Sequence, residues 1–205
     1  MNEAEAQAWL RDNFEIGDRQ WQKLEQFLEI LRQEMAHQNL ISKASAEHVW
    51  ARHVVDSAQL LLYVPEQISS GTWLDLGTGA GFPGIIIAIL GGFHVQMVES
   101  RARRIAFLQH VVDAIDIGGQ ATVQGSRLEV MESFPVDVIS ARAFAPLGKL
   151  LSLSHRFSTE KTLWLLPKGK NAVRELQELS PRRRKMFHVE QSVTDAEAGI
   201  LVGTG

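Results

Sequence analysis

Apolar side chains in the first part of the chain recur at the spacing of a helix. Within residues 18–36 they occupy Trp21, Leu24, Leu28, Leu31 and Met35. This spacing places them on one helical face. A second apolar run covers residues 45–63 and begins with Ser45, a residue type that caps helix N-termini. Both runs precede every strand-like stretch, so we expect residues 1–65 to form a helical extension packed on the core.

From residue 72 onward, short apolar runs alternate with helical periodicity. Strands are predicted at residues 72–76, 94–99, 121–125, 136–144 and 162–169. Helices are predicted at residues 82–90, 103–115, 126–134, 147–157 and 171–179. Residues 185–205 indicate two strands around a polar turn, the last of them at a sheet edge. Such alternation is typical of a doubly wound α/β domain. We therefore expect residues 66–205 to form one unit with a mostly parallel seven-stranded sheet and helices on both faces.

The first predicted strand runs into a glycine-rich stretch, TWLDLGTGAGFPG at residues 72–84. Glycine permits turns with positive φ and a close approach of the backbone to a ligand. Ligands of open α/β sheets bind beyond the carboxyl ends of the strands, so the loop with Gly77, Thr78, Gly79 and Gly81 is the candidate site. Residues 79–84 also match the G-x-G-x-x-G pattern of dinucleotide-binding proteins, which keeps an NAD-linked oxidoreductase among the alternatives.

The residues around this loop favour S-adenosylmethionine over a dinucleotide. Counted from Gly77, the spacing is G-x-G-x-G, and Phe82 falls where a dinucleotide loop has its third glycine. Asp75 precedes the loop, where a carboxylate repels a pyrophosphate and attracts the cationic amino group of an amino-acid-like cofactor. Glu99 ends the next predicted strand, in place to accept the ribose hydroxyls that both kinds of cofactor carry. We therefore predict a Rossmann-like class I S-adenosylmethionine-dependent methyltransferase.

Composition narrows the chemistry further. The 205 residues include no cysteine, which excludes disulfides, thiolate metal sites and cysteine nucleophiles. An apolar run of about 18 residues is absent, and the acidic start lacks the pattern of a signal peptide, so we expect a cytoplasmic protein that does not enter the membrane.

The net charge is −3, yet RARR at 101–104 and RRRK at 182–185 are dense basic clusters. Either cluster fits a solvated surface or a nucleic-acid contact.

The methyl acceptor is narrowed by elimination. Methylation at pyrimidine C5 commonly needs a cysteine, and the Pro-Pro motif common in amino-group methyltransferases does not occur. A catechol-type metal site needs clustered carboxylates, and Asp137 stands alone, so we expect no metal. Guanine N7 carries a free lone pair, and its methylation requires positioning but no base. Arg142, at the end of the fourth predicted strand, suits a guanine edge, a phosphate, the cofactor or a surface ion pair.

Several motifs follow one another in a recognisable order. They are NLIS at 39–42, RHVVDSAQLL from Arg52, the glycine stretch, GSRLE at 125–129, ISARAF at 139–144 and LPKGK at 166–170. From about residue 20 to its end the chain resembles the bacterial 16S ribosomal RNA guanine-N7 methyltransferase family, also called glucose-inhibited division protein B. The resemblance implies methyl transfer from S-adenosylmethionine to N7 of a guanine in 16S ribosomal RNA, either free or in the small subunit.

The resemblance and the glycine loop together assign candidate roles. The predicted cofactor-binding residues are Asp75, Gly77, Thr78, Gly79, Gly81, Phe82, Glu99, Leu128, Glu129 and Arg142. The predicted RNA-binding residues are Asn39, Arg52, His53, Ser57, Lys168 and Lys170. Arg142 and Asp56 are the candidates for the catalytic centre, the first to position the base or the cofactor and the second to stabilise the cationic product. From spacing alone, Arg52 and Asp56 equally fit an i,i+4 ion pair on one helical face.

The residues leave other functions open. The alternatives are a non-catalytic RNA-binding or ribosome-assembly factor and a small-molecule methyltransferase. Binding of S-adenosylhomocysteine but not NADH would exclude the oxidoreductase, and steep salt dependence of RNA binding would favour an RNA acceptor. We expect the protein to be a monomer.

Overall fold

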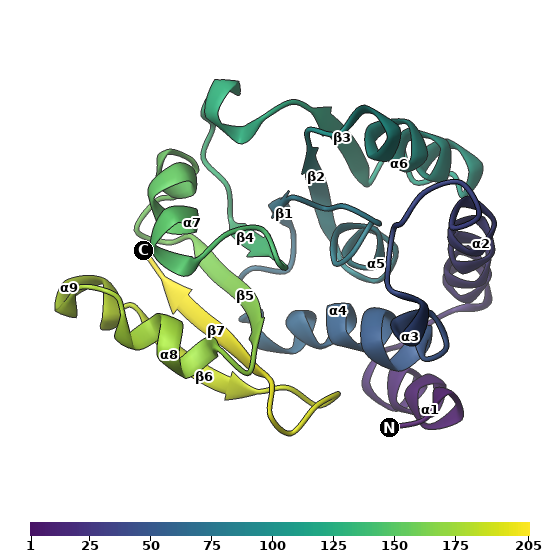
Figure 1. The fold of residues 1–205 in the computed structure, drawn as a ribbon, viewed down its shortest axis with the longest axis horizontal. Coiled ribbons are helices and arrows are strands. Elements are labelled where there is room, and N and C mark those ends of the chain that lie inside the picture. Colours follow the sequence, from purple (N-terminus) through teal and green to yellow (C-terminus); the bar gives the residue numbers. More distant parts are fainter.

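In the computed structural model, which describes residues 1–205, seven strands form one sheet in the order β3-β2-β1-β4-β5-β7-β6 (Figure 1). The strands are β1 (Gly71–Leu76), β2 (Phe93–Glu99), β3 (Ala121–Gly125), β4 (Val138–Ala141), β5 (Leu163–Gly169), β6 (Phe187–Gln191) and β7 (Gly199–Thr204). The first five run parallel, and β7 pairs antiparallel with β5 and β6. The predicted seven-stranded, mostly parallel sheet is confirmed. The expectation of a final edge strand is wrong, because β7 carries buried side chains on both faces and lies inside the sheet.

Helices cover both faces of the sheet, as predicted. They are α1 (Glu3–Asn13), α2 (Asp18–Glu34), α3 (Lys43–Ala46), α4 (Asp56–Ala58), α5 (Gly84–Leu90), α6 (Ala102–Ala114), α7 (Leu147–Ser154), α8 (Ala172–Gln177) and α9 (Pro181–Arg184). On one face, apolar residues of α1, α2, α5 and α6 share a cluster with Trp73. On the other, α7 and α8 pack with Leu74 and Trp164. Trp73 and Leu74 lie on opposite faces because successive strand residues alternate. None of the helices combines the length and the apolar character needed to cross a membrane.

The N-terminal helices contribute to the main core. Leu10 of α1 and Phe27 of α2 are fully buried, in the same cluster as Ile85 of α5. Helix α1 begins with a capping box, in which the Asn2 side chain accepts from the Glu5 N–H and the Glu5 carboxylate accepts from the Asn2 N–H. The helical character expected for this part of the chain is therefore present, and it begins earlier than the periodicity at residues 18–36 indicated.

Residues 45–63 do not form the single helix that their apolar pattern predicts. Helix α3 ends at Ala46, and it is followed by a π-helix, η1 (Trp50–Val55), by α4, and by a 3-10 helix, η2 (Gln59–Tyr63). Hydrogen bonds of a π-helix span five residues instead of four, and such turns occur often at functional sites. The altered spacing changes which side chains share a face, and this affects the predicted RNA-binding residues.

The predicted helix at residues 126–134 is also wrong. Only one 3-10 turn forms, η3 (Leu128–Val130), and the chain continues without regular structure to β4. Pro135 restricts the preceding Phe134 to extended conformations, which prevents a helix from continuing there. The short turn nevertheless places Leu128 and Glu129 around one cavity with Gly77 and with Glu99, at the end of β2.

Candidate functional site

The glycine loop joins β1 to α5 at the carboxyl edge of the sheet. Gly77, Gly79 and Gly81 adopt φ values of 68°, 61° and 97°, in the left-handed region that favours glycine. The N–H groups of Gly77 and Thr78 donate to the carbonyl oxygen of Val98 over 2.9 and 3.1 Å, which fixes the loop to the end of β2. A Cβ atom at Gly77 would lie 2.6 Å from Cδ2 of Phe144. The loop is therefore a tight cradle that admits no side chain at its first glycine.

Asp75, near the end of β1, holds this loop in place through hydrogen bonds. Its carboxylate is fully buried and accepts hydrogen bonds from the Ser140 hydroxyl (2.8 Å) and the Gly84 N–H (3.1 Å). The Thr78 hydroxyl donates to the Asp75 carbonyl oxygen over 3.1 Å. Burial raises the pKa of Asp75 above its ordinary range, against the hydrogen bonds that favour ionisation. The expectation that Asp75 and the Thr78 hydroxyl face the cofactor needs correction, because both groups are buried and bonded within the protein.

A narrow cleft of about 360 Å³ opens beside the loop. Glu99, at the end of β2, lines it and is 6% exposed. Oε1 of Glu99 accepts from the N–H groups of Ser100 (2.7 Å) and Arg101 (2.9 Å), while Oε2 lies 3.7 Å from Nη1 of Arg104. Leu128 and Glu129 of η3 line the same cleft. The structure thus brings Gly77, Glu99, Leu128 and Glu129 together.

The chain beyond β4 separates the narrow cleft from a second one. Ala143 has a φ of 52°, a left-handed conformation that strains a residue with a side chain. Strained residues of this kind concentrate at functional sites. Phe144 follows it and lies against Gly77. Ala143, Phe144 and Ala145 line both cavities, so this segment is their common wall.

The second, wide cleft has a volume of about 870 Å³ and is lined by balanced charges. Each cation that lines it has a carboxylate partner in the same cleft. The pairs are Arg52–Asp195 (3.3 Å), Arg142–Asp56 (3.4 Å), Lys168–Glu175 (3.0 Å) and Arg174–Glu178 (3.8 Å). Its electrostatic field is therefore largely compensated from within.

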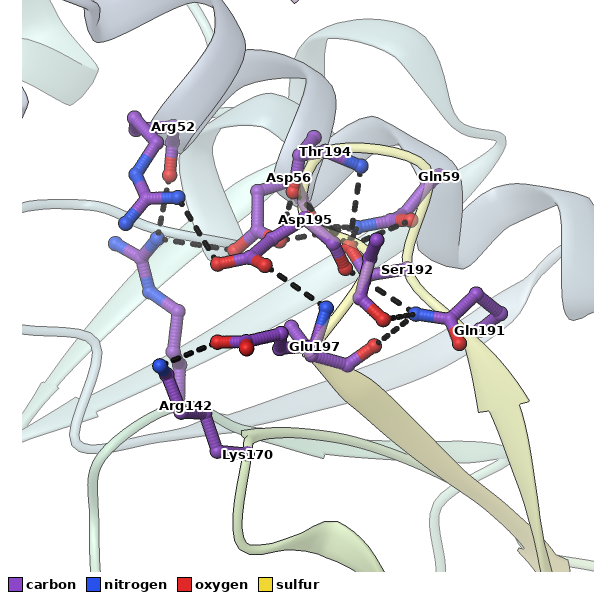
Figure 2. Close-up of polar contacts among 12 residues, drawn as sticks. Arg52, Asp56, Gln59, Arg142, Lys170, Gln191, Ser192, Thr194, Asp195 and Glu197 are labelled. Atoms are coloured by element: carbon purple, nitrogen blue, oxygen red, sulfur yellow. Dashed lines mark hydrogen bonds and ion pairs between the residues drawn. The ribbon is translucent and has the colours of Figure 1, made fainter.

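The loop between β6 and β7 supplies part of this compensation (Figure 2). Asp195 pairs with Arg52, the Thr194 hydroxyl donates to Oδ1 of Asp56 over 3.2 Å, and Glu197 pairs with Lys170. A hydrogen bond from the Glu197 N–H, together with Arg52, lowers the pKa of Asp195. The i,i+4 ion pair between Arg52 and Asp56 does not form, because the π-helix intervenes and each finds a partner on another element.

His53 is buried beside the glycine loop. Its ring stacks on Phe82 with centroids 4.8 Å apart, and neither ring nitrogen has a hydrogen-bond partner. Burial, with Arg142 and Arg52 nearby, lowers the pKa of His53 to about 3, so the imidazole is neutral at physiological pH. Ser57 is 1% exposed, and its hydroxyl donates to the His53 carbonyl oxygen over 2.6 Å. An RNA contact by Ser57 is therefore contradicted, and His53 offers no positive charge to a phosphate.

Phe82 is a core residue rather than part of the narrow cleft. It is 2% exposed and packs on Phe27 with centroids 5.2 Å apart, while the Arg142 guanidinium lies 5.3 Å from its ring centre. Gly81 has a similar setting, since a Cβ atom there would meet Ile85 and Phe27. The Phe82 ring and Gly81 therefore hold the loop against α2, and their predicted cofactor contacts stay predictions.

The remaining predicted RNA contacts are spread over different environments. The Lys168 side chain is 8% exposed, pairs with Glu175 and donates to the Ala145 carbonyl oxygen over 3.0 Å. Its ammonium holds the turn after β4, and the predicted phosphate contact of Lys168 stays a prediction. Lys170 is exposed but pairs with Glu197. Asn39 lines neither cleft and belongs to a separate cavity near α3.

Sequence reasoning missed several residues of this site. Arg104, Phe144 and Asp195 were not singled out, although the RARR and ISARAF motifs contain the first two. Arg104 lies 3.4 Å from the Cβ position of Gly79 and near Glu99, and it lines the narrow cleft beside the loop. No local pattern marks Asp195, because its partner Arg52 is 143 positions away in the sequence.

Comparison with known proteins gives a consistent result. Residues 20–200 match the family model described as GidB, rRNA small subunit methyltransferase G. A ribosomal RNA small subunit methyltransferase G of Novosphingobium aromaticivorans is 50% identical, covering 99% of this chain and 88% of that protein. The protein of the same name from Zymomonas mobilis is 45% identical over 100% of this chain and 94% of its own.

Solved structures support the fold at low sequence identity. The B. subtilis tRNA methyltransferase TrmK superposes with a TM-score of 0.56 at 13% identity, over 73% of this chain and 65% of its own. A ribosomal protein L11 methylase from Lactobacillus delbrueckii gives a TM-score of 0.55 at 14% identity, over 73% and 76% of the two chains. These likenesses confirm the predicted methyltransferase fold.

Proposed function

This chain belongs to the rRNA small subunit methyltransferase G family and is an S-adenosylmethionine-dependent rRNA methyltransferase, and we propose that it methylates guanine N7 of 16S ribosomal RNA. The reaction is proposed to take place where the two clefts of the protein adjoin. The observation that carries this proposal is the common wall Ala143–Ala145, which lines both cavities. A cofactor in the narrow cleft and a base in the wide cleft would approach each other at this wall, beside Arg142.

The residues of the narrow cleft fit an adenosine cofactor. Gly77 lines this cleft with backbone alone, and Cδ2 of Phe144 lies 2.6 Å from the position that a Cβ atom at Gly77 would take. Oε2 of Glu99 makes only a distant contact with Arg104, so it retains acceptor capacity for a ribose hydroxyl. Leu128 and Glu129 at the cleft wall are proposed to flank the adenine.

The chemistry requires alignment more than acid–base catalysis. S-adenosylmethionine supplies an electrophilic sulfonium methyl group, and guanine N7 offers a lone pair that needs no deprotonation. The protein therefore has to hold the base in line and exclude competing orientations, which accounts for a large part of such rate enhancements. A base unstacked from an RNA loop is accessible to a cleft of this kind.

Arg142 and Asp56 are the proposed groups at the reacting base. Nη1 of Arg142 lies 3.4 Å from Oδ2 of Asp56 and 3.4 Å from the Arg52 carbonyl oxygen. Gln59 and Thr194 donate to Oδ1 of Asp56 over 3.0 and 3.2 Å. The guanidinium can donate to O6 of a guanine, and the fixed carboxylate can offset the positive charge that the base gains on methylation.

The test is transfer of labelled methyl groups from S-adenosylmethionine to unmodified 16S RNA and to small subunits, followed by nucleoside analysis. Label in 7-methylguanosine is the expected result, and label in any other nucleoside would refute the acceptor. Arg142→Ala should reduce turnover on the order of 100-fold, since misplacement alone has effects of this size. Arg174→Ala, which removes an exposed arginine paired with Glu178 in the same cleft, is the matched control and should retain activity.

Three further points belong to the proposal. We propose that the enzyme acts as a monomer, because one chain forms both clefts. We place it in the cytoplasm, where its RNA substrate is made. We also retain the division into a helical extension, residues 1–65, and a methyltransferase part, residues 66–205, which share one core cluster. Sedimentation of the purified protein tests the first point, and a truncation that removes residues 1–65 tests the last.

A further inference from the structure

The cations of the narrow cleft differ from those of the wide cleft in their pairing. Four basic side chains line the narrow cleft, Arg101, Arg104, Arg127 and Lys149, against two carboxylates, those of Glu99 and Glu129. Only Arg104 has an ion-pair partner, Glu99. Arg101, Arg127 and Lys149 are exposed and form no ion pair. We call these three residues the free-cation rim.

The fold explains why the free-cation rim surrounds the cleft mouth. Arg101 follows β2 and caps α6, Arg127 follows β3, and Lys149 stands in the first turn of α7 after β4. The carboxyl ends of neighbouring parallel strands meet at one edge of the sheet, so residues distant in the sequence converge there. Helix α6, with 13 residues, begins at the same place, and the positive end of its dipole adds to the attraction for anions.

A methyl donor does not account for this excess of charge. S-adenosylmethionine carries a single carboxylate and no phosphate, and its ammonium and sulfonium groups leave it with a net positive charge. An uncompensated group of exposed cations attracts a polyanion, and RNA offers one phosphate for each nucleotide. Because the wide cleft holds four internal ion pairs, its cations are already neutralised.

We propose that Arg101, Arg127 and Lys149 bind backbone phosphates of the substrate RNA, so that the strand crosses the mouth of the narrow cleft while its target base enters the wide cleft. This inference rests on the proposed function and specifies how that substrate is held. It moves the phosphate contacts from Lys168 and Lys170, which are paired within the protein, to the opposite side of the Ala143–Ala145 wall. RNA bound in this way also covers the cofactor and slows its exchange.

The experiment compares two triple variants that remove the same charge. Arg101→Ala, Arg127→Ala and Lys149→Ala together remove the free-cation rim. The control combines Lys161→Ala, Arg182→Ala and Lys185→Ala, three exposed cations without ion pairs near the amino ends of β5 and β6, away from both clefts. Thermal unfolding and S-adenosylhomocysteine binding establish that each variant folds and retains its cofactor site.

Binding is measured to unmodified 16S RNA and to small subunits from cells that lack the enzyme, over a series of salt concentrations. Each single-strand phosphate contact contributes about 0.7 to the slope of log K against log salt. The rim variant should therefore lose about 2 units of slope and on the order of 50-fold in affinity near 0.15 M salt. The control should bind like the wild type.

The outcomes separate this inference from the proposed function. Equal losses in both variants, or no loss in the rim variant, would overturn the free-cation rim as an RNA site. A loss confined to the rim variant supports it, as does slower S-adenosylhomocysteine release when RNA is bound. If the wild type binds through the rim but forms no 7-methylguanosine, the proposed acceptor is wrong and the binding site stands.

Discussion

The close contact between Gly77 and Phe144 gives a prediction that combines stability and cofactor binding. In Gly77→Ala, the new methyl group meets two costs. The residue keeps a φ of 68°, which costs about 1–2 kcal/mol for a residue with a Cβ atom. The Cβ atom also lies 2.6 Å from Cδ2 of Phe144, where carbon atoms normally remain about 3.5–4.0 Å apart. Overpacking of this kind costs about 1–3 kcal/mol, so we expect a total of about 2–5 kcal/mol.

Two other glycines separate these contributions. Gly169 has a φ of 56° and no atom within 4 Å of its Cβ position, so Gly169→Ala carries the conformational cost alone. Gly119 has equally open surroundings and no left-handed φ. Gly119→Ala should be neutral or should raise stability by up to about 1 kcal/mol, because alanine restricts the unfolded chain.

The assay is urea unfolding of each variant at constant m-value, together with calorimetric binding of S-adenosylhomocysteine. Gly77→Ala should be less stable than Gly169→Ala. Of the three variants, only Gly77→Ala should bind S-adenosylhomocysteine more weakly than the wild type does. Adding Phe144→Ala to Gly77→Ala should recover about 1–3 kcal/mol relative to additivity, because the two side chains are in direct contact. Equal destabilisation at Gly77 and Gly169, or strict additivity with Phe144→Ala, would refute the reasoning.

Three further substitutions test the burial around the glycine loop. Burial raises the pKa of Asp75, so wild-type stability should fall as pH rises above the ordinary value of 3.8, because the folded state retains the proton more tightly. In unfolding measurements across a pH series, Asp75→Asn should not show this fall in stability. A pH profile parallel to that of the wild type would contradict the prediction. Phe82→Ala should lose about 3–5 kcal/mol in urea unfolding, whereas a small loss would indicate that the ring is not packed on Phe27. Ser57→Ala should cost about 0.5–1.5 kcal/mol and leave the KM for RNA unchanged, and a raised KM would restore Ser57 as an RNA contact.

The sheet was predictable because buried parallel strands leave a strong local signal. Strands covered on both faces read as short apolar runs, and β1, which buries Trp73 on one face and Leu74 on the other, spans Gly71–Leu76 against the predicted residues 72–76. The glycine loop was equally visible, since a left-handed turn at Gly77 leaves few alternatives to glycine. Glu99 was correctly placed at the end of β2, and the structure brings it to the narrow cleft.

The site's polar partners could not be read from the sequence. Asp75 was identified as a chemically notable residue, but Ser140 and Gly84, which bind its carboxylate, come from other elements. The spacing of Arg52 and Asp56 indicated an ion pair under α-helical geometry. The π-helix at Trp50–Val55 and the distant β6–β7 loop determined their actual partners. Periodicity reports neighbours along one element, and these contacts depend on how several elements pack.

The internal ion pairs of the wide cleft have a consequence for competing molecules. A free guanine nucleotide carries the same base as the RNA, but its phosphates find no unpaired cation in this cleft and meet the carboxylates of Asp56, Glu175 and Asp195 instead. Placing a negative ligand group against these carboxylates disfavours the competing ligand and so contributes to specificity, as attractive contacts do. We therefore expect the cell's large pool of GTP to compete poorly for the base site. A guanine can enter the wide cleft when it belongs to an RNA strand whose phosphates stay outside this cleft.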